Sequence, residues 1–292
     1  MVAVSIEHLL ESRPRDVAGL AVRRVLPVLA QRSVGPFVFF DHMGPAVLAP
    51  GTGVDVPPHP HIGLATVTYL FAGELVHRDT LGSHQVIRPG DVNWMAAGRG
   101  IAHSERSGEA ARAEGATVHG IQSWFALPKG HEQDAPSFEH HGAASLPVIE
   151  RGGSRLTIVA GTAWGERSPV GVLSPTLYVD ARFDTDATVV LDEEHEQRAV
   201  YVAEGELEHD GKLARPGMLM VLAPGGHPEL RAHAATRAML LGGAKLDGPR
   251  HIWWNFVASD ATRIEQAKRD WAEDRFGEVP GDSAERVPLP SR

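Results

Sequence analysis

Two short segments of this chain carry side chains of the kind that bind metal ions, at the same spacing. One residue separates His59 from His61, and one residue separates His103 from Glu105, a pair that begins forty-two residues after His61. Residues i and i+2 of a β-strand point to the same face, so each pair would project together from an extended segment. Two such strands facing each other would assemble three imidazole nitrogens and one carboxylate oxygen, a donor set suited to a transition-metal ion.

Each pair taken alone has a simpler interpretation as ordinary surface or core residues, because His-x-His spacing is a weak motif by itself. The two pairs together, with a glycine-marked turn at Gly98–Gly100, favour the metal site. The competing histidines are His77, His84 and His119. The first two flank a turn at residues 80–83, and we expect them to be exposed loop residues rather than ligands.

The elements that would hold these pairs are short strands. Apolar or alternating runs of four to seven residues lie between glycine and proline turns, a pattern typical of an all-β sandwich or barrel. The prolines around His59 lack an amide hydrogen, so we expect that strand at the rim of a barrel. The expected strands include Phe37–Phe40, Ala65–Phe71, Val92–Met95, Gln122–Leu127, Leu156–Ala160, Ala199–Ala203, Met218–Leu222 and Ala238–Leu241.

One helix is expected near the C-terminus, because apolar residues recur there at helical spacing behind a capping residue. The proline-rich stretch that follows it is expected to be irregular. The residues that mark the helix are Ser259 or Asp260 as the cap, Ile264, Ala267 and Trp271 as the buried face, and Gly277 just past its end.

The chain also repeats part of itself. The run from Tyr69 to His77 is similar to the run from Tyr201 to His209, at an offset of 132 residues. A second match, at an offset of 127 residues, relates Arg88–Val92 to Arg215–Leu219. A repeat on this scale predicts a duplicated domain rather than a solenoid.

We therefore expect two tandem β-barrels, at residues 1–132 and 147–292, with the C-terminal helix and tail belonging to the second. The second barrel has no paired histidines where the first has His59 and His61. We expect it to have lost its site, so that the chain binds one metal ion. A second site would have to use Glu193 or His195 together with His227 and Glu229.

Composition limits the functions open to the chain. It has 292 residues, no cysteine and a formal charge of 28 − 37 = −9. The lack of cysteine excludes disulfides, thiolate metal sites and a cysteine nucleophile, and an acidic balance without a basic block disfavours direct binding of nucleic acid. Neither a secretory signal nor an apolar stretch of about 20 residues is visible, so we expect a cytoplasmic protein that does not enter the membrane.

One long motif joins the two metal-binding pairs. It runs from His59-Pro60-His61 through Val67–Gly73 to Pro89–Glu105, where the sequence reads PGDVNWMAAGRGIAHSE, and it continues at Gln122–Pro128. This motif resembles that of the pirins, a family of bicupins whose chains contain two cupin barrels of the jelly-roll type. Two C-terminal segments, Arg250–Val257 and Phe276–Asp282, resemble one bacterial branch of the family.

The resemblance implies the ligands, the cofactor and the range of functions. His59, His61, His103 and Glu105 would bind one metal ion per chain, usually iron, although manganese, nickel, copper and zinc accept the same donors. Pirins include proteins with quercetin 2,3-dioxygenase activity and transcriptional co-regulators. Many relatives have a glutamate where this chain has Ala65. This departure removes a supporting carboxylate and weakens the expectation of the same substrate.

The expected function is a mononuclear-iron dioxygenase acting on a flavonol or a related small aromatic molecule. Glu105 or a bound water would accept the proton of the flavonol 3-hydroxyl, and oxygen would cleave the heterocycle with loss of carbon monoxide. The main alternative is a metal- and redox-dependent regulator that acts through a protein partner, and an isomerase or hydrolase is a third. Candidate supporting side chains are Phe37, Phe39, Met43, Trp94, Met95 and Trp124, with Asp41, His42, His119 and Gln122 as polar candidates.

Overall fold

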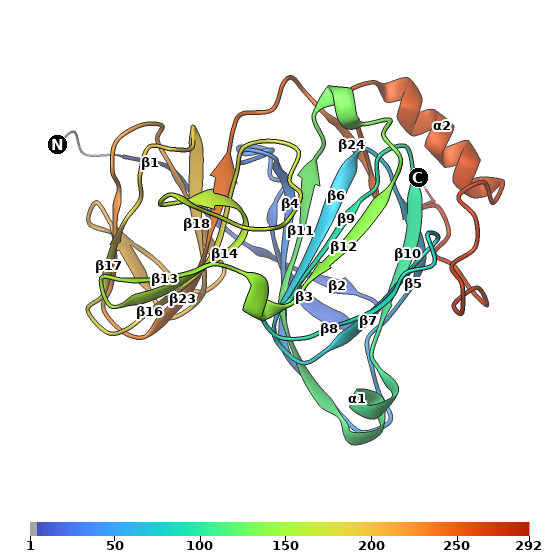
Figure 1. The fold of residues 1–292 in the computed structure, drawn as a ribbon, viewed down its shortest axis with the longest axis horizontal. Helices are drawn as coiled ribbons and strands as arrows, with labels where there is room; N and C mark the ends of the chain where they lie inside the picture. Colours follow the sequence, from blue (N-terminus) through green and yellow to red (C-terminus); the bar gives the residue numbers. More distant parts are fainter. Residues whose placement is uncertain (1–4, 292) are drawn as a thin grey trace. The chain divides into compact units, whose positions relative to one another are not determined.

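The computed structural model describes residues 5–291, and most of its regular structure is β-strand (Figure 1). The chain forms two compact units, each assembled from segments that are separate in the sequence. Unit 1 consists of residues 5–14, 23–42 and 144–245. Unit 2 consists of residues 15–22, 43–143 and 246–291.

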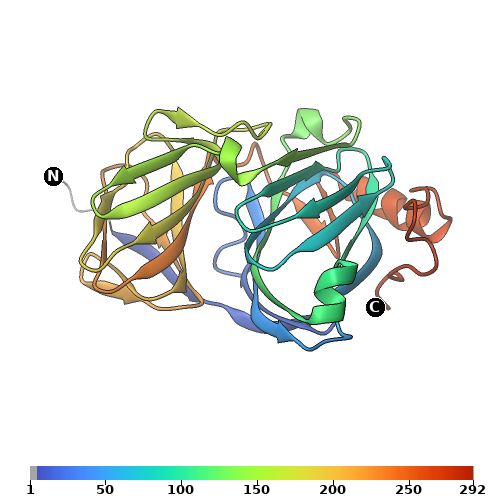
Figure 2. The same cartoon turned by 60° about the horizontal axis from the view of Figure 1, so that its bottom comes forward.

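Unit 2 contains the predicted metal ligands and is a barrel of two sheets, with helix α2 (Ala261–Ala272) lying outside its strands in Figures 1 and 2. One sheet has the order β5 (Asp55–His61), β10 (Ile101–Arg106), β7 (Leu75–Asp79) and β8 (His84–Ile87). The other has the order β12 (Ser137–His141), β9 (Val92–Ala96), β6 (Leu64–Ala72), β11 (Ala116–Ala126), β4 (Phe37–Leu48), β3 (Leu20–Leu26) and β2 (Arg13–Val17), and the last three strands have residues in both units. The smaller elements of unit 2 are α1 (Glu109–Glu114), the 3-10 turn η1 (Lys129–His131), and the hairpin of β24 (His251–Trp253) and β25 (Phe256–Ala258).

Unit 1 repeats this plan. Its large sheet has the order β1 (Ile6–Glu11), β21 (Met218–Leu222), β18 (Gln197–Glu204), β23 (Thr236–Gly243), β16 (Thr176–Phe183), β14 (Ser154–Ala163) and β13 (Val148–Arg151), with β15 (Glu166–Arg167) paired to β14. Its small sheet has the order β17 (Thr188–Val190), β22 (Glu229–Ala232), β19 (Leu207–His209) and β20 (Lys212–Ala214). The 3-10 turn η2 (Ala143–Ser145) lies where the chain passes from unit 2 to unit 1.

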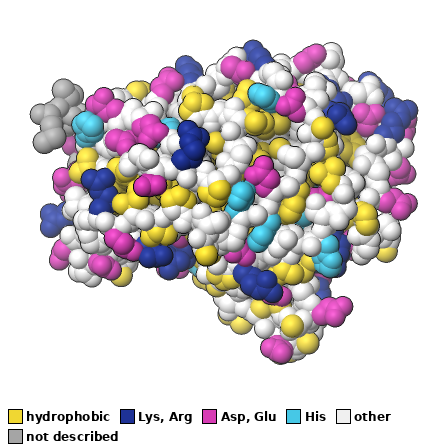
Figure 3. All heavy atoms as spheres, in the orientation of Figure 1, with side chains coloured by type: hydrophobic (Ala, Val, Ile, Leu, Met, Phe, Trp, Pro, Cys, Tyr) yellow, Lys and Arg dark blue, Asp and Glu magenta, His cyan; other side chains and the backbone are white. Residues whose placement is uncertain are grey.

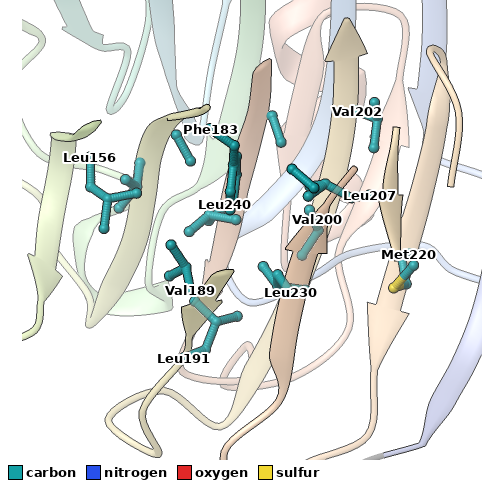
Figure 4. Packing of buried hydrophobic residues seen from close by; sticks show 14 of the residues in the cluster. Leu156, Phe183, Val189, Leu191, Val200, Val202, Leu207, Met220, Leu230 and Leu240 are labelled. Atoms are coloured by element: carbon teal, nitrogen blue, oxygen red, sulfur yellow. The ribbon is translucent and has the colours of Figure 1, made fainter. Parts of the chain in front are cut away.

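The interior of the unit 1 barrel is filled with apolar side chains, which Figure 4 shows packed between the strands. Alternate residues of each strand point inward, so the periodicity of two in the sequence becomes a continuous core. Val200 and Val202 from β18 and Met220 from β21 are fully buried there. Close-packed apolar side chains therefore fill the interior of the unit 1 barrel.

These features confirm the fold class predicted from the sequence: a largely β protein with two jelly-roll barrels and one C-terminal helix. Each of the eight expected strands overlaps a strand of the structure. Asp260 caps α2, and its carboxylate accepts a hydrogen bond from the Thr262 N–H (2.8 Å). Ile264, Ala267 and Trp271 are buried as expected, although the helix ends at Ala272, five residues before Gly277.

The division into units differs from the contiguous domains expected at residues 1–132 and 147–292. The chain crosses between Ala143 and Ala144, but residues 246–291 return to unit 2 instead of staying with the second barrel. The reason lies in the apolar face of α2, which must be buried against a matching surface. It packs against Ile62, which follows the ligand-bearing strand β5, and against Ala102, which lies within the ligand-bearing strand β10.

The described helices are too short and too polar for any of them to cross a bilayer. Acidic and basic side chains are interspersed over the face that Figure 3 displays, with neither sign gathered into a block on that face. This distribution agrees with the mixed charge pattern of the sequence.

Candidate metal centre

The strands β5 and β10 lie side by side and carry all four predicted ligands. His59 is directly opposite His103, and His61 is opposite Ile101. Between His103 and Glu105 the register shifts, because β5 has the two residues Pro57 and Pro58 where β10 has one. Proline has no N–H to donate to a neighbouring strand. The β-bulge and the edge position of β5 explain how this strand can contain three prolines and still pair with β10.

The three histidines converge as the spacing predicted. His59, His61 and His103 each offer a ring nitrogen within 4.8 Å of the others, and all three side chains are buried. Glu105 lies beside this group, with Oε2 3.8 Å from Nε2 of His59 and Oε1 3.4 Å from Nδ1 of His103. The structure thus brings the four residues together.

Backbone carbonyls fix the orientation of two of the imidazoles. His59 Nδ1 donates to the carbonyl oxygen of Pro57 (2.9 Å), and His61 Nδ1 donates to that of Asn255 (3.2 Å). A carbonyl oxygen only accepts hydrogen bonds, so the proton of each neutral ring is on Nδ1 and the lone pair is on Nε2. This is the tautomer that a ligand bound through Nε2 requires.

His103 supplies the direct test of whether these residues fit a metal ion. Its Nε2 is buried and has no hydrogen-bond partner. An unpaired buried nitrogen is costly, and proteins rarely keep one without a reason. A cation held by His59, His61 and His103 would give that nitrogen its partner, so the donor set fits the ion that the sequence predicted.

Burial also sets the charge of the cluster. Removal from water lowers the pKa of His59 to about 4 and lowers the pKa values of His61 and His103 well below their usual value. The rings are therefore neutral near pH 7 and keep the lone pairs that a metal needs. Burial raises the pKa of Glu105 to about 8. An adjacent cation would favour its ionised form, which is the form that binds metal.

The sequence-based expectation for His77 was wrong. We expected an exposed loop residue, but His77 lies in β7 opposite Glu105 and its side chain is buried. The strand continues through Asp79, which is fully buried, before the turn begins. The i, i+2 spacing of His77 and Asp79 matches that of the two ligand pairs, and this spacing was the signal available in the sequence. His84 is exposed as expected, although it belongs to β8.

The expected supporting residues divide between the two units. The ring centroids of Trp124 and His61 are 5.2 Å apart, so Trp124 is a direct neighbour of the cluster. By contrast, Phe37, Phe39, Asp41 and His42 belong to unit 1, because β4 passes from one unit into the other. The remaining candidates lie in unit 2, where Met43, Trp94 and Met95 are buried apolar residues, Gln122 Oε1 accepts a hydrogen bond from Thr68 (2.8 Å), and His119 packs on Phe71.

The position of Ala65 agrees with the departure noted in the sequence. Ala65 is fully buried in β6, between Ala96 of β9 and Phe125 of β11. The side chain at this position is therefore a buried methyl group and not a carboxylate. The hydrogen bonds that hold His59 and His61 come from the backbone carbonyls of Pro57 and Asn255.

The C-terminal segment of unit 2 braces both ligand strands. The N–H of Val287 donates to the carbonyl oxygen of Pro58 on β5 (2.9 Å). On β10, Arg106 forms a two-pronged ion pair with Asp282, with nitrogen–oxygen distances of 2.7 and 2.9 Å. The sequence could not reveal these contacts, because they join residues more than 170 positions apart.

The small sheet of unit 1 shows what stands at the corresponding positions of the other barrel. Glu105 of β10 is opposite His77 of β7. In unit 1, continuing the β22–β19 register by one residue places Leu230 opposite His209, the residue that echoes His77. Leu191, just beyond β17, is the residue that corresponds to His59 at the repeat offset of 132. Both leucines belong to the apolar core.

The side chains that a second site would need do not converge. His227 Nε2 lies 3.6 Å from Glu193 Oε1, but both side chains are more than half exposed. His195 is buried, and its Nε2 is 2.9 Å from the carbonyl oxygen of Thr162. Across residues 5–291, a group of three potential ligands within reach of one ion is found at His59, His61 and His103.

Two jelly-roll barrels in one chain, with a buried cluster of three histidines in one barrel, define a bicupin with a candidate metal centre. Comparison with known families agrees with this class. Residues 19–125 match the family model described as Pirin, and residues 178–277 match that of the Pirin C-terminal cupin domain. The chain belongs to the pirin family.

Individual relatives extend over nearly the whole chain. A pirin-like protein of Caulobacter vibrioides is 47% identical over 288 residues, which are 98% of this chain and 99% of that protein. A Pseudomonas aeruginosa protein that is provisionally named a quercetin 2,3-dioxygenase is 38% identical, over 97% of this chain and 91% of its own.

Two solved structures have the same fold. The crystal structure of quercetin 2,3-dioxygenase from Acinetobacter baumannii superposes with a TM-score of 0.90 at 33% identity, covering 98% of this chain and 95% of that one. The bacterial pirin YhhW of Escherichia coli, solved in complex with nickel(II), superposes with a TM-score of 0.65 at 17% identity, covering 82% and 99%. At that identity the second likeness is one of fold.

Proposed function

We propose that this pirin binds one transition-metal ion, iron in its working form, through His59, His61, His103 and Glu105. We further propose that it uses the ion as a dioxygenase of the quercetin 2,3-dioxygenase type. The observation that carries the proposal is the buried, unpartnered Nε2 of His103, in a cluster with two other neutral imidazoles. Similarity to proteins named as quercetin 2,3-dioxygenases supports the choice of reaction.

The residues of the site would divide the work as follows. A bound iron ion would supply the affinity for dioxygen and for an oxygen anion of the substrate that this chemistry needs. Glu105 is the carboxyl group nearest the histidines and is therefore the group proposed to accept the proton of a flavonol hydroxyl. Trp124 offers an aromatic surface beside His61, suited to contact with a flat aromatic substrate.

The proposal is tested by measuring metal content and turnover on the same samples. We expect one iron per chain by elemental analysis. When quercetin and air are added to protein that was loaded with iron anaerobically, we expect oxygen uptake and release of carbon monoxide. The double variant His59→Ala/His103→Ala should lose both. The matched control is His227→Ala/Glu193→Ala, which removes an exposed histidine and glutamate from unit 1 and should change neither.

The outcomes separate the metal site from the reaction. Metal retained by His59→Ala/His103→Ala would overturn the assignment of the ligands. Stoichiometric metal without oxygen uptake on any of a panel of flavonols would overturn the dioxygenase and favour the regulatory alternative, in which the metal controls binding to a protein partner. Parallel loading with manganese, nickel, copper and zinc identifies which ion supports turnover, since these four ions accept the same donors as iron.

A further inference from the structure

Behind His103 lies a second histidine that the proposed ligand set does not use. His77 Nδ1 is 3.4 Å from His103 Nδ1, in hydrogen-bonding geometry. On its other side, His77 Nε2 is 2.9 Å from Oδ2 of Asp79. The two links form a continuous chain from His103 through His77 to a carboxylate, and all three side chains are buried.

The surroundings hold this chain in one geometry. Oδ1 of Asp79 accepts hydrogen bonds from the N–H groups of Leu81 (2.9 Å) and Ser83 (3.0 Å), which fix the carboxylate. The ring of His77 stacks on Phe138, with centroids 4.3 Å apart and planes inclined by 13°. A buried carboxylate anchored on one oxygen and a ring held by stacking leave His77 little freedom to turn.

The direction of the hydrogen bonds follows from these partners. Both oxygens of Asp79 face N–H groups, Oδ1 those of Leu81 and Ser83 and Oδ2 the ring of His77, so the carboxylate accepts the hydrogen bond and His77 Nε2 carries the proton. A neutral His77 then has a lone pair on Nδ1, aimed at His103. For His103 to bind an ion through Nε2, its proton must be on Nδ1, and Glu105, the other group near that nitrogen, is itself a proposed ligand.

We propose that His77 and Asp79 are positioning residues for the metal centre. They hold His103 in the tautomer that binds through Nε2, and they pass negative charge from Asp79 to that ligand. A histidine whose N–H faces a carboxylate-backed acceptor is a more basic ligand, which strengthens metal binding and favours the higher oxidation state of iron. The inference rests on the proposed metal site and not on the dioxygenase reaction.

Asp79→Asn is the sharpest test, because the two backbone N–H groups require an oxygen at the Oδ1 position. The amide nitrogen of the asparagine must then face His77 Nε2, and as a donor it forces the His77 proton onto Nδ1. Two N–H groups would then point at each other between His77 and His103. His77→Phe removes the acceptor but keeps an aromatic ring on Phe138, and the control is His84→Phe on the neighbouring strand, where His84 is exposed.

The experiment strips the full-length protein with a chelator and titrates it anaerobically with Fe(II) against a competing chromophoric chelator. The reduction potential of the loaded protein is measured by spectroelectrochemistry. We expect Asp79→Asn and His77→Phe to bind iron roughly 10- to 100-fold more weakly than the parent, the range found for such supporting groups, and to have a higher potential. His84→Phe should match the parent in both.

Three results would overturn the inference. They are an unchanged potential in both variants, an affinity loss equal to that of His84→Phe, and a parent protein that binds no metal, which would also remove the proposed site. A parent protein that binds iron but does not turn over quercetin would instead contradict the proposed reaction alone. Circular dichroism of the metal-free variants identifies misfolding, and if one variant misfolds the other decides the question.

Discussion

Gly63 follows the ligand-bearing strand β5, at the point where the chain passes the C-terminal hairpin of β24 and β25. Its φ of +64° lies in the left-handed region, and a Cβ atom placed on it would be 2.0 Å from the carbonyl oxygen of Val257. The same hairpin donates a hydrogen bond from Val257 N to Ile62 O (3.1 Å) and supplies the Asn255 carbonyl that holds His61. We therefore expect Gly63→Ala to reduce both the stability of the fold and the affinity of the metal centre.

The expected magnitude has two parts. The left-handed backbone costs an alanine about 1–2 kcal/mol. A carbon–oxygen contact of 2.0 Å is more than 1 Å too short, so the hairpin must move away from Ile62. Loss of the Val257–Ile62 hydrogen bond adds about 1 kcal/mol. We expect Gly63→Ala to lose roughly 2–3 kcal/mol of stability, and to bind iron about 10-fold more weakly because His61 loses its carbonyl partner.

Gly51→Ala is the matched control in the same unit. Gly51 also has a positive φ, +86°, but nothing lies within 4 Å of the position that its Cβ would take. It should lose only the conformational part, about 1–2 kcal/mol, and keep the parent affinity for iron. Urea unfolding of the metal-free proteins and the Fe(II) competition titration give both quantities. Equal destabilisation of the two variants, or normal iron affinity in Gly63→Ala, would refute the reasoning.

Three further predictions concern metal removal, the Arg106–Asp282 ion pair and the apolar core of unit 1. Removing the metal with a chelator should lower the melting temperature, since an ion at 1,000 times its dissociation constant stabilises the native state by about 4 kcal/mol, and calorimetry before and after chelation checks this. Burial would raise the pKa of Asp282, but its hydrogen bond from Arg106 keeps that pKa below the usual value. The pair therefore stabilises the folded protein fully above the unfolded-state pKa of about 4. This stabilisation is lost as the pH falls through the folded-state pKa. Asp282→Asn should therefore cost roughly 1–2 kcal/mol in urea unfolding at pH 7, with a gap to the parent that narrows as the pH falls below about 4; a gap independent of pH would contradict this. Leu230→Glu, which places a carboxyl group in the apolar core of unit 1, should cost about 3 kcal/mol or more without adding a metal ion, as unfolding and elemental analysis would show.

Much of the site was available from local sequence because strand geometry is local. The i, i+2 spacing of His59 with His61, and of His103 with Glu105, sets the side of the strand on which each residue lies. Two such pairs and the glycine turns were enough to predict the cluster. The same rule would have found His77 and Asp79, but we placed His77 in a loop because the turn residues at positions 80–83 were given more weight.

The chain's own residues thus determined the strand pattern, the two-barrel fold, the capped helix and the identity of the clustered histidines, since each depends on the spacing of side chains along an extended or helical backbone. Tertiary structure alone decided the rest. It brought residues 246–291 back to unit 2, set the Asn255 carbonyl against His61, and stacked Phe138 on His77. These contacts depend on which apolar surfaces find each other after the strands have formed, and that choice is made by packing over the whole unit rather than by neighbouring residues.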